Sequence, residues 1–142
     1  MKKLFTLIIA IIALASCSSD SYVTRNPYLN AGNFSVAIDM NLPLYNNLLY
    51  TANPVVVSID GYGINGLILM NTGSGYVAWE NSCPNQELSS CSLLRVNGTY
   101  ATCPCDSVQY SLFTGQPTTA MKYNLKAYRV EILSNTAIRV YN

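Results

Sequence analysis

The sequence of 142 residues contains no histidine. Histidine is the commonest general base near neutral pH, so its absence excludes Ser-His-Asp and Cys-His catalytic mechanisms. The remaining titratable residues form no recognisable catalytic set. Glu80 and Glu87 are the carboxylates nearest to the cysteine-containing loops described below, and we expect both to be solvated. We therefore expect that the protein is not an enzyme.

Charged residues are also scarce, at 11% of the chain, whereas hydrophobic residues make up 50%. The formal net charge of +1 becomes −1 once Lys2 and Lys3 are removed with the N-terminal segment. Proteins that bind nucleic acid neutralise phosphates with clustered Lys and Arg, so no nucleic-acid partner is expected. The 11 tyrosines fit a β-rich domain, either as strand residues or as part of a binding surface.

The only long apolar run lies at the N-terminus, where Leu4 to Leu14 follow two lysines. A transmembrane helix needs about 20 apolar residues, so this shorter run predicts a cleaved secretion signal. The segment Leu14-Ala15-Ser16-Cys17 resembles the bacterial lipobox. The resemblance implies that residues 1–16 are a signal peptide and that Cys17 becomes an N-terminus carrying diacylglycerol and palmitate.

Lipidation of Cys17 would anchor the mature chain in the outer membrane or cell envelope, outside the cytoplasm. The alternative is an ordinary secreted protein in which Cys17 is an unpaired thiol, an odd cysteine in an oxidising compartment. Only Asp20 closely follows Cys17, which is no strong acidic signal for export to the cell surface. The sequence leaves open which leaflet holds the protein.

Two regions follow Cys17. Residues 17–33 are rich in Ser, Asn and Gly and read as a linker, and residues 34–142 have the size of one domain. No window of the mature chain has a helical stripe, and short β-branched or aromatic segments alternate with Gly, Asn and Pro, which predicts an all-β domain. The predicted strands are residues 34–40, 55–59, 67–70, 76–79, 108–113, 125–133 and 137–141.

The segment from Gly61 to Gly66 matches the dinucleotide-binding pattern G-x-G-x-x-G. That pattern binds pyrophosphate only where the glycines lead into a helix. Here they lead into the predicted strand 67–70. The segment therefore predicts a turn between two strands, without a nucleotide.

Four cysteines remain after Cys17, and an exported protein favours disulfides. Four cysteines allow three pairings. Cys103 and Cys105 flank a single proline, and a bridge between them would close too small a ring. Two pairings therefore remain open from the residues alone.

The cysteine segments resemble the loops of the Rieske family, which bind a [2Fe–2S] cluster through two cysteines and two histidines. Cys83-Pro84-Asn85 is similar to the first loop of that family, roughly Cys-x-His. The segment from Cys103 to Ser107 is similar to the second, roughly Cys-Pro-x-His-Gly-Ser, and residues 110–117 follow the family's aromatic, Thr-Gly and Pro pattern. The resemblance implies a small Rieske-like antiparallel β sandwich or barrel with two disulfide-linked tip loops.

This chain departs from the Rieske pattern at both histidine positions, which hold Asn85 and Asp106. Neither an amide nor one carboxylate is a good replacement for imidazole at such a site. We therefore expect degenerate ligand positions, no bound metal and no cofactor.

The resemblance also implies how the cysteines pair. In high-potential members, the inner cysteine of the second loop bridges to an extra cysteine of the first, which corresponds to Cys105 and Cys91 here. Cys83 and Cys103, at the positions of two iron ligands, would then form the other bridge. The alternative exchanges the partners, as Cys83–Cys105 with Cys91–Cys103.

Three functions fit the sequence. The first is a cluster-free module that binds another membrane or periplasmic protein, for example as an accessory subunit of an outer-membrane complex, through an edge strand or loop residues such as Tyr45-Asn46-Asn47 and Tyr50. The second is a redox or metal protein that uses the four cysteines as a thiolate site or exchanges thiols with a partner. The third is a lipoprotein that binds a glycan or small ligand through Trp79 and tyrosines.

Overall fold

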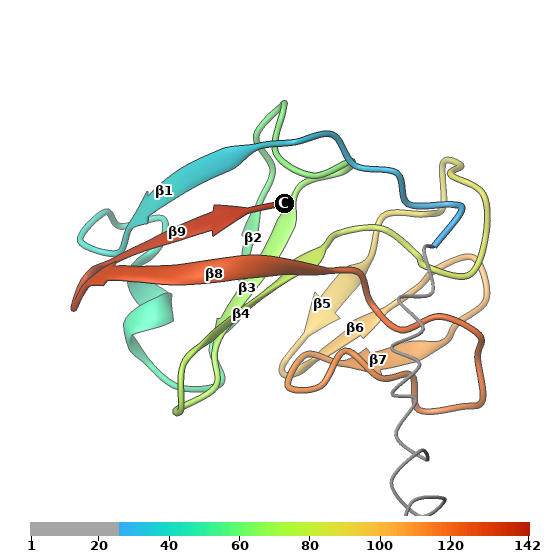
Figure 1. Ribbon diagram of the computed structural model, residues 1–142. Helices are drawn as coiled ribbons and strands as arrows, with labels where there is room; N and C mark the ends of the chain where they lie inside the picture. Colours follow the sequence, from blue (N-terminus) through green and yellow to red (C-terminus); the bar gives the residue numbers. More distant parts are fainter. Residues whose placement is uncertain (1–25) are drawn as a thin grey trace, which may run out of the picture.

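The computed structural model describes residues 26–142, which form an all-β domain of two antiparallel sheets (Figure 1). The larger sheet has six strands in the order β1-β9-β8-β4-β3-β2, and the smaller has the order β5-β6-β7. The elements are β1 (Ser35–Asp39), the 3-10 helix η1 (Asn46–Leu49), β2 (Val55–Val57), β3 (Leu67–Asn71), β4 (Tyr76–Glu80), β5 (Arg95–Asn97), β6 (Tyr100–Thr102), β7 (Gln109–Ser111), β8 (Ala127–Ser134) and β9 (Ala137–Tyr141).

Strand β8 joins the two halves of the larger sheet. Its first residues, Ala127 and Tyr128, pair with β4, whereas the residues from Arg129 onward pair with β9. Because one strand changes partner along its length, the sheet curls rather than lying flat. The curled sheet encloses one hydrophobic cluster, which includes Ile38 and Ile138.

Strand β3 lies between two hydrophobic clusters. Side chains alternate across a strand, so Leu67 and Leu69 belong to the cluster inside the curled sheet. Ile68 and Met70 point the other way and pack in a second cluster with residues of the smaller sheet. All four side chains are fully buried, which explains why this segment is a continuous apolar run.

The structure confirms the all-β prediction and adds three elements to the predicted strands. Strands β5 and β6 form a tight hairpin through Gly98 and Thr99, in which Gly98 has a φ of +56°. The Asn97-Gly98 pair is a turn signal that sequence analysis overlooked, because both strands are only three residues long. The third addition, η1, is a single turn with one buried residue, Leu48.

Residues 26–33, the last part of the predicted linker, lie against the domain. Leu29 is buried, and the Asn142 side chain donates to the carbonyls of Ala31 and Gly32. The Asn26 side chain donates to the carbonyl of Pro84, which brings this end of the chain beside the first cysteine loop. The predicted signal peptide and Cys17 lie outside the described residues. Within residues 26–142, no helix is long and apolar enough to cross a membrane.

Candidate functional site at the disulfide tip

The two cysteine loops meet at one end of the domain, which we call the tip. The first loop connects β4 to β5, and the second connects β6 to β7. Cys83 is bonded to Cys103, and Cys91 to Cys105, with Cα–Cα distances of 5.4 and 5.2 Å. Both bridges cross between the loops, and this is the pairing implied by the resemblance to the Rieske family. The structure thus confirms two disulfide-linked tip loops.

Asn85 fastens the first loop to distant parts of the chain. Its Nδ2 donates to the Tyr110 hydroxyl at 3.0 Å and to the Tyr123 carbonyl at 2.8 Å. Its Oδ1 accepts from the Tyr123 backbone N–H at 2.8 Å. Burial raises the pKa of Tyr110 above its ordinary value. The hydrogen bond from Asn85 lowers this pKa in part, and the negative charge of Asp106 raises it further. Tyr110 is therefore a neutral partner of Asn85 at physiological pH.

Asp106, at the other position expected to be a degenerate ligand, is exposed and stabilises the turn in which it lies. Its Oδ1 accepts from the Val108 N–H at 2.9 Å. Backbone bonds from Ser107 N to Cys103 O and from Cys103 N to Val108 O close the same turn. Ser107 has a φ of +63°, in the left-handed region. The two positions expected to be degenerate ligands thus both take part in the protein's own hydrogen bonds.

Glu80 is fully buried, and the expectation that it is solvated is wrong. Its carboxylate accepts from the backbone N–H groups of Ile64 and Asn65 at 2.7 and 2.9 Å, from the Ser82 hydroxyl at 2.8 Å and from the Tyr128 hydroxyl. Burial raises the pKa of Tyr128. The hydrogen bond that Tyr128 donates to Glu80 and the negative charge of Glu80 raise it further. Four donors satisfy the buried carboxylate without a cation.

The donors to Glu80 explain the glycine pattern between β2 and β3. Gly63 has a φ of +73°, and a Cβ there would lie 2.7 Å from Glu80 Oε2. The loop therefore surrounds a carboxylate of the same chain with backbone N–H groups, the geometry by which such loops bind anions. Its anion is Glu80. The predicted turn between two strands is confirmed. Glu87 is exposed, as expected.

The aromatic residues named for a ligand platform, Trp79, and for a protein-binding surface, Tyr45 and Tyr50, differ in exposure. Trp79 is buried, its Nε1 donates to the Leu112 carbonyl at 2.9 Å, and Gly115 packs against its ring. Tyr45 is also buried, whereas Tyr50 is exposed. Trp79 therefore offers no face to a ligand.

A groove with a volume of about 740 Å³ runs between residues 26–33 and the segment before β8. No carboxylate side chain lines it. Its lining includes Lys122 and Lys126, the two lysines of residues 26–142, together with the amides of Asn30, Asn33 and Asn124. The side chains of the groove therefore carry two positive charges and no negative one.

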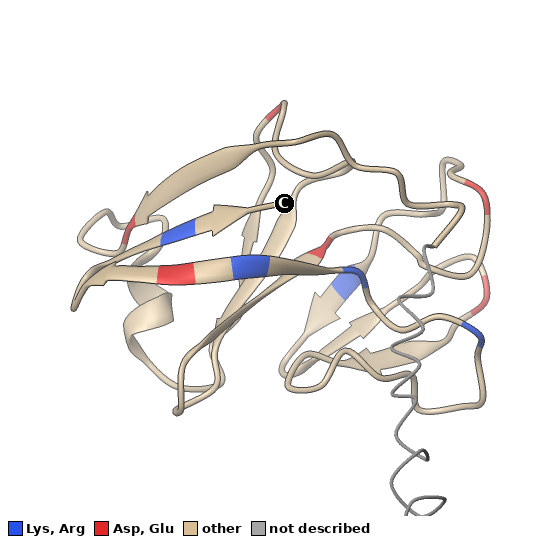
Figure 2. Ribbon diagram, viewed as in Figure 1, with Lys and Arg blue, Asp and Glu red and all other residues tan. Residues whose placement is uncertain are grey.

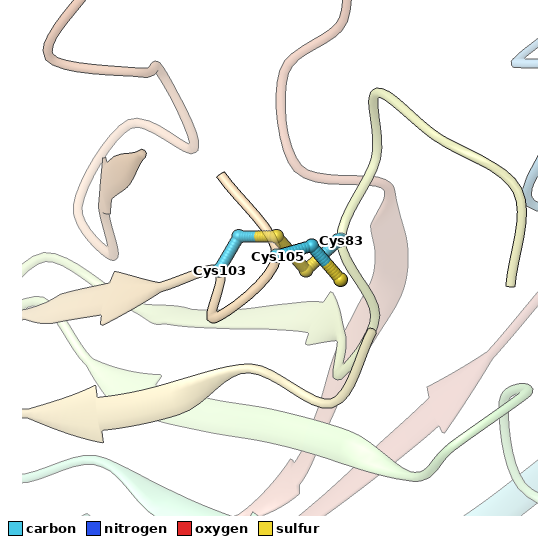
Figure 3. A group of neighbouring side chains, drawn as sticks. All are labelled: Cys83, Cys103 and Cys105. Atoms are coloured by element: carbon cyan, nitrogen blue, oxygen red, sulfur yellow. A yellow bond between two sulfur atoms is a disulfide. The ribbon is translucent and has the colours of Figure 1, made fainter. Parts of the chain in front are cut away.

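The sulfur atoms of Cys83, Cys103 and Cys105 lie within 4.8 Å of one another (Figure 3). Sulfur ligands of one tetrahedral metal are separated by a similar distance, on the order of 3.7 Å. Here these sulfurs are held in the two disulfides. Thiolates bind metals and disulfide sulfurs do not, so the residues as bonded do not fit an iron–sulfur cluster or a zinc ion.

No protein-family profile and no curated protein matches this chain. Among solved structures, a protein described as an NADH-dependent nitrite reductase small subunit from Mycobacterium tuberculosis shares 16% identity, with a TM-score of 0.46 over 78% of this chain and 96% of that one. The ferredoxin of carbazole 1,9a-dioxygenase from Nocardioides aromaticivorans shares 19%, with a TM-score of 0.45 over 78% and 97%. The chain is thus similar in structure, at low identity, to Rieske-type ferredoxins and nitrite reductase small subunits.

Replacing Asn85 by Ala should lower the free energy of unfolding by about 1–3 kcal/mol, because it leaves the backbone groups of Tyr123 without partners inside the tip. Asn85→Asp should also destabilise, since a carboxylate cannot donate to the Tyr123 carbonyl and would lie against its oxygen. Urea unfolding measures both. Asn124→Ala, at an exposed position, is the control and should change stability by less than about 0.5 kcal/mol. An Asn85→Ala protein as stable as this control would contradict the assigned role.

Proposed function

We propose that the mature chain is a lipid-anchored extracytoplasmic lipoprotein whose Rieske-like domain carries no cluster and binds another membrane or periplasmic protein. The lipobox-like segment supports the lipid anchor, and the absence of histidine supports a domain without a cluster. An accessory subunit of an outer-membrane complex would have these properties.

One observation carries the cluster-free part of the proposal: the tip is closed by its own bonds. The disulfides engage every cysteine of residues 26–142, and Asn85 makes three hydrogen bonds within the chain. Binding a cluster would require breaking a buried disulfide and would still lack two imidazole ligands. The tip as bonded is therefore not suited to electron transfer through a cluster.

The opposite end of the domain supports a binding role. The connection from β1 to β2 and the turn between β8 and β9 lie at this end (Figure 1), linked by a bond from Met40 N to Thr136 O. We define the apolar end as the exposed large side chains of the β1–β2 connection and of the last part of β8, which are Leu42, Leu44, Leu49, Tyr50, Ile132 and Leu133. Leu44, Tyr50 and Ile132 are each more than 60% exposed. Several exposed apolar residues at one end of a domain favour a protein-binding surface there.

Charge and position favour a protein as the partner of the apolar end. The segment 41–50 contains no charged residue (Figure 2), so no lysine or arginine in it would attract an anionic lipid surface. Asn26 lies at the tip, beside Pro84. The chain from Cys17 to Asn26 reaches at most about 30 Å. A tether that enters at the tip leaves the apolar end on the side away from the anchor, where it can meet a neighbouring protein.

Replacing Cys17 by Ala tests the anchor. The variant should accumulate as an unprocessed or soluble form, because the diacylglycerol acceptor is gone. Cell fractionation with immunoblotting measures the distribution. An unchanged membrane fraction would contradict lipid anchoring.

A photo-crosslinking residue at Leu44, installed in living cells, tests the partner. We expect a discrete adduct that contains a cell-envelope protein, since Leu44 lies on the proposed binding surface. The same residue at Leu88 is the control, because Leu88 is 45% exposed but lies on the first tip loop. Identical adducts at both positions, or none at Leu44, would contradict the proposal.

The groove favours a second candidate function, binding of an anionic glycan. Its two ammonium groups and its amides are the groups that recognise carboxylated sugars, and its volume suits a small ligand. Calorimetry with a short oligouronide should show binding that the Lys122→Ala/Lys126→Ala double variant loses, and a neutral oligosaccharide of equal length should not bind. Equal binding of both sugars, or of neither, would remove this candidate.

A further inference from the structure

The two disulfides of the tip differ in access to solvent. Cys83 and Cys103 are fully buried, whereas Cys91 is exposed and Cys105 is half-buried. Exchange with a disulfide requires a thiolate to reach one of its sulfurs. An external thiol therefore meets the Cys91–Cys105 bridge, the outer bridge, before it can reach the Cys83–Cys103 bridge, the inner one.

The sulfur of Cys105 lies close to the inner bridge. It is within 4.8 Å of both Cys83 Sγ and Cys103 Sγ, and Cys91 Sγ is not part of this group (Figure 3). Cys105 lies in the turn that the Cys103–Val108 backbone bond closes. This turn does not depend on the outer bridge, so Cys105 stays near the inner bridge when its bond to Cys91 breaks.

Polar groups lie where thiolates would form. The Ser89 hydroxyl is 3.3 Å from Cys91 Sγ and 3.8 Å from Cys105 Sγ, so it can donate to either sulfur after the outer bridge opens. Gln86 Nε2 donates to Cys103 Sγ at 3.8 Å. A hydrogen bond to a developing thiolate stabilises it as a leaving group. Both bridges thus have a donor beside the sulfur that would be released.

We infer that the tip is a two-step thiol–disulfide exchange site for an external dithiol, in which Cys105 transmits opening of the outer bridge to the inner one. In the first step, a thiolate of the dithiol attacks Cys91 Sγ, and Cys105 leaves as a thiolate. The second thiol of the dithiol then attacks the first sulfur of the dithiol, which is bonded to Cys91 Sγ in this mixed disulfide. Cys91 leaves as a thiolate. The dithiol becomes a disulfide, and two electrons pass to Cys91 and Cys105.

In the second step, the Cys105 thiolate attacks Cys83 Sγ. The Cys83–Cys105 bond forms, the Cys83–Cys103 bond breaks and Cys103 leaves as a thiolate, with no net change in oxidation state. Cys83 is the target rather than Cys103, because a Cys103–Cys105 bridge would close too small a ring. The product is a rearranged tip in which Cys103, beside Gln86, is the free thiol.

Partial reduction of the wild-type protein tests the relay without altering its folding. The protein is treated with less than one equivalent of dithiothreitol, quenched in acid, alkylated and mapped by mass spectrometry. We expect molecules with two labels to carry one on Cys91 and the other on either Cys105 or Cys103, together with a Cys83–Cys105 linked peptide. Labels confined to Cys91 and Cys105, or first found on the inner pair, would overturn the inference.

Two serine variants supply a matched comparison. Cys91→Ser leaves Cys105 unpaired beside the inner bridge, so alkylation should label both Cys105 and Cys103. Cys105→Ser leaves Cys91 unpaired outside the sulfur group, so only Cys91 should be labelled and Cys83–Cys103 should stay intact. Labelling of Cys105 alone in the first variant, or the same scrambling in both, would overturn the relay.

Discussion

The arrangement of the tip depends on the covalent bond between Cys83 and Cys103. This bond lies inside the hydrophobic cluster that joins the smaller sheet to β3 and β4, with Leu94 and Tyr110 among its neighbours. It closes a loop with a sequence separation of 20 residues, for which chain-entropy arguments give a stabilisation of about 3 kcal/mol. The smaller sheet has only three short strands, which alone bury little apolar surface. The inner bridge therefore both fastens this sheet and fixes the register of the two loops.

Two places in the fold resemble ligand sites, and at both the protein's own groups bond to one another. The glycine-rich loop before β3 directs backbone N–H groups at a carboxylate, and that carboxylate is Glu80. The cysteine loops place sulfurs at metal-binding separations, and those sulfurs bond to one another. Asn85 adds hydrogen bonds that hold the first cysteine loop to Tyr110 and Tyr123. In each place, an arrangement of groups that could bind a ligand holds the protein's own groups instead.

The sequence predicted the fold class and most strands, because β-branched and aromatic segments bounded by Gly, Asn and Pro are a local signal. It missed β5 and β6, whose three-residue strands carry little periodicity. The roles of the site residues depend on contacts between distant parts of the chain. Glu80 is buried because its donors come from the loop before β3 and from Tyr128, 48 residues away. The partner of Asn85, Tyr123, is 38 residues away, so the sequence marked the position but not its function.

We propose that disulfides occupy the place of a cluster in this protein. The most direct test is to secrete the chain from Ser18 onward into an oxidising compartment and to measure intact mass, thiol labelling and iron in the same sample. We expect a mass four hydrogens below that of the reduced chain, no thiol labelled before reduction, four labelled after it, and a colourless protein without iron. A coloured protein with tightly bound iron, or free thiols at Cys83 and Cys103, would contradict it.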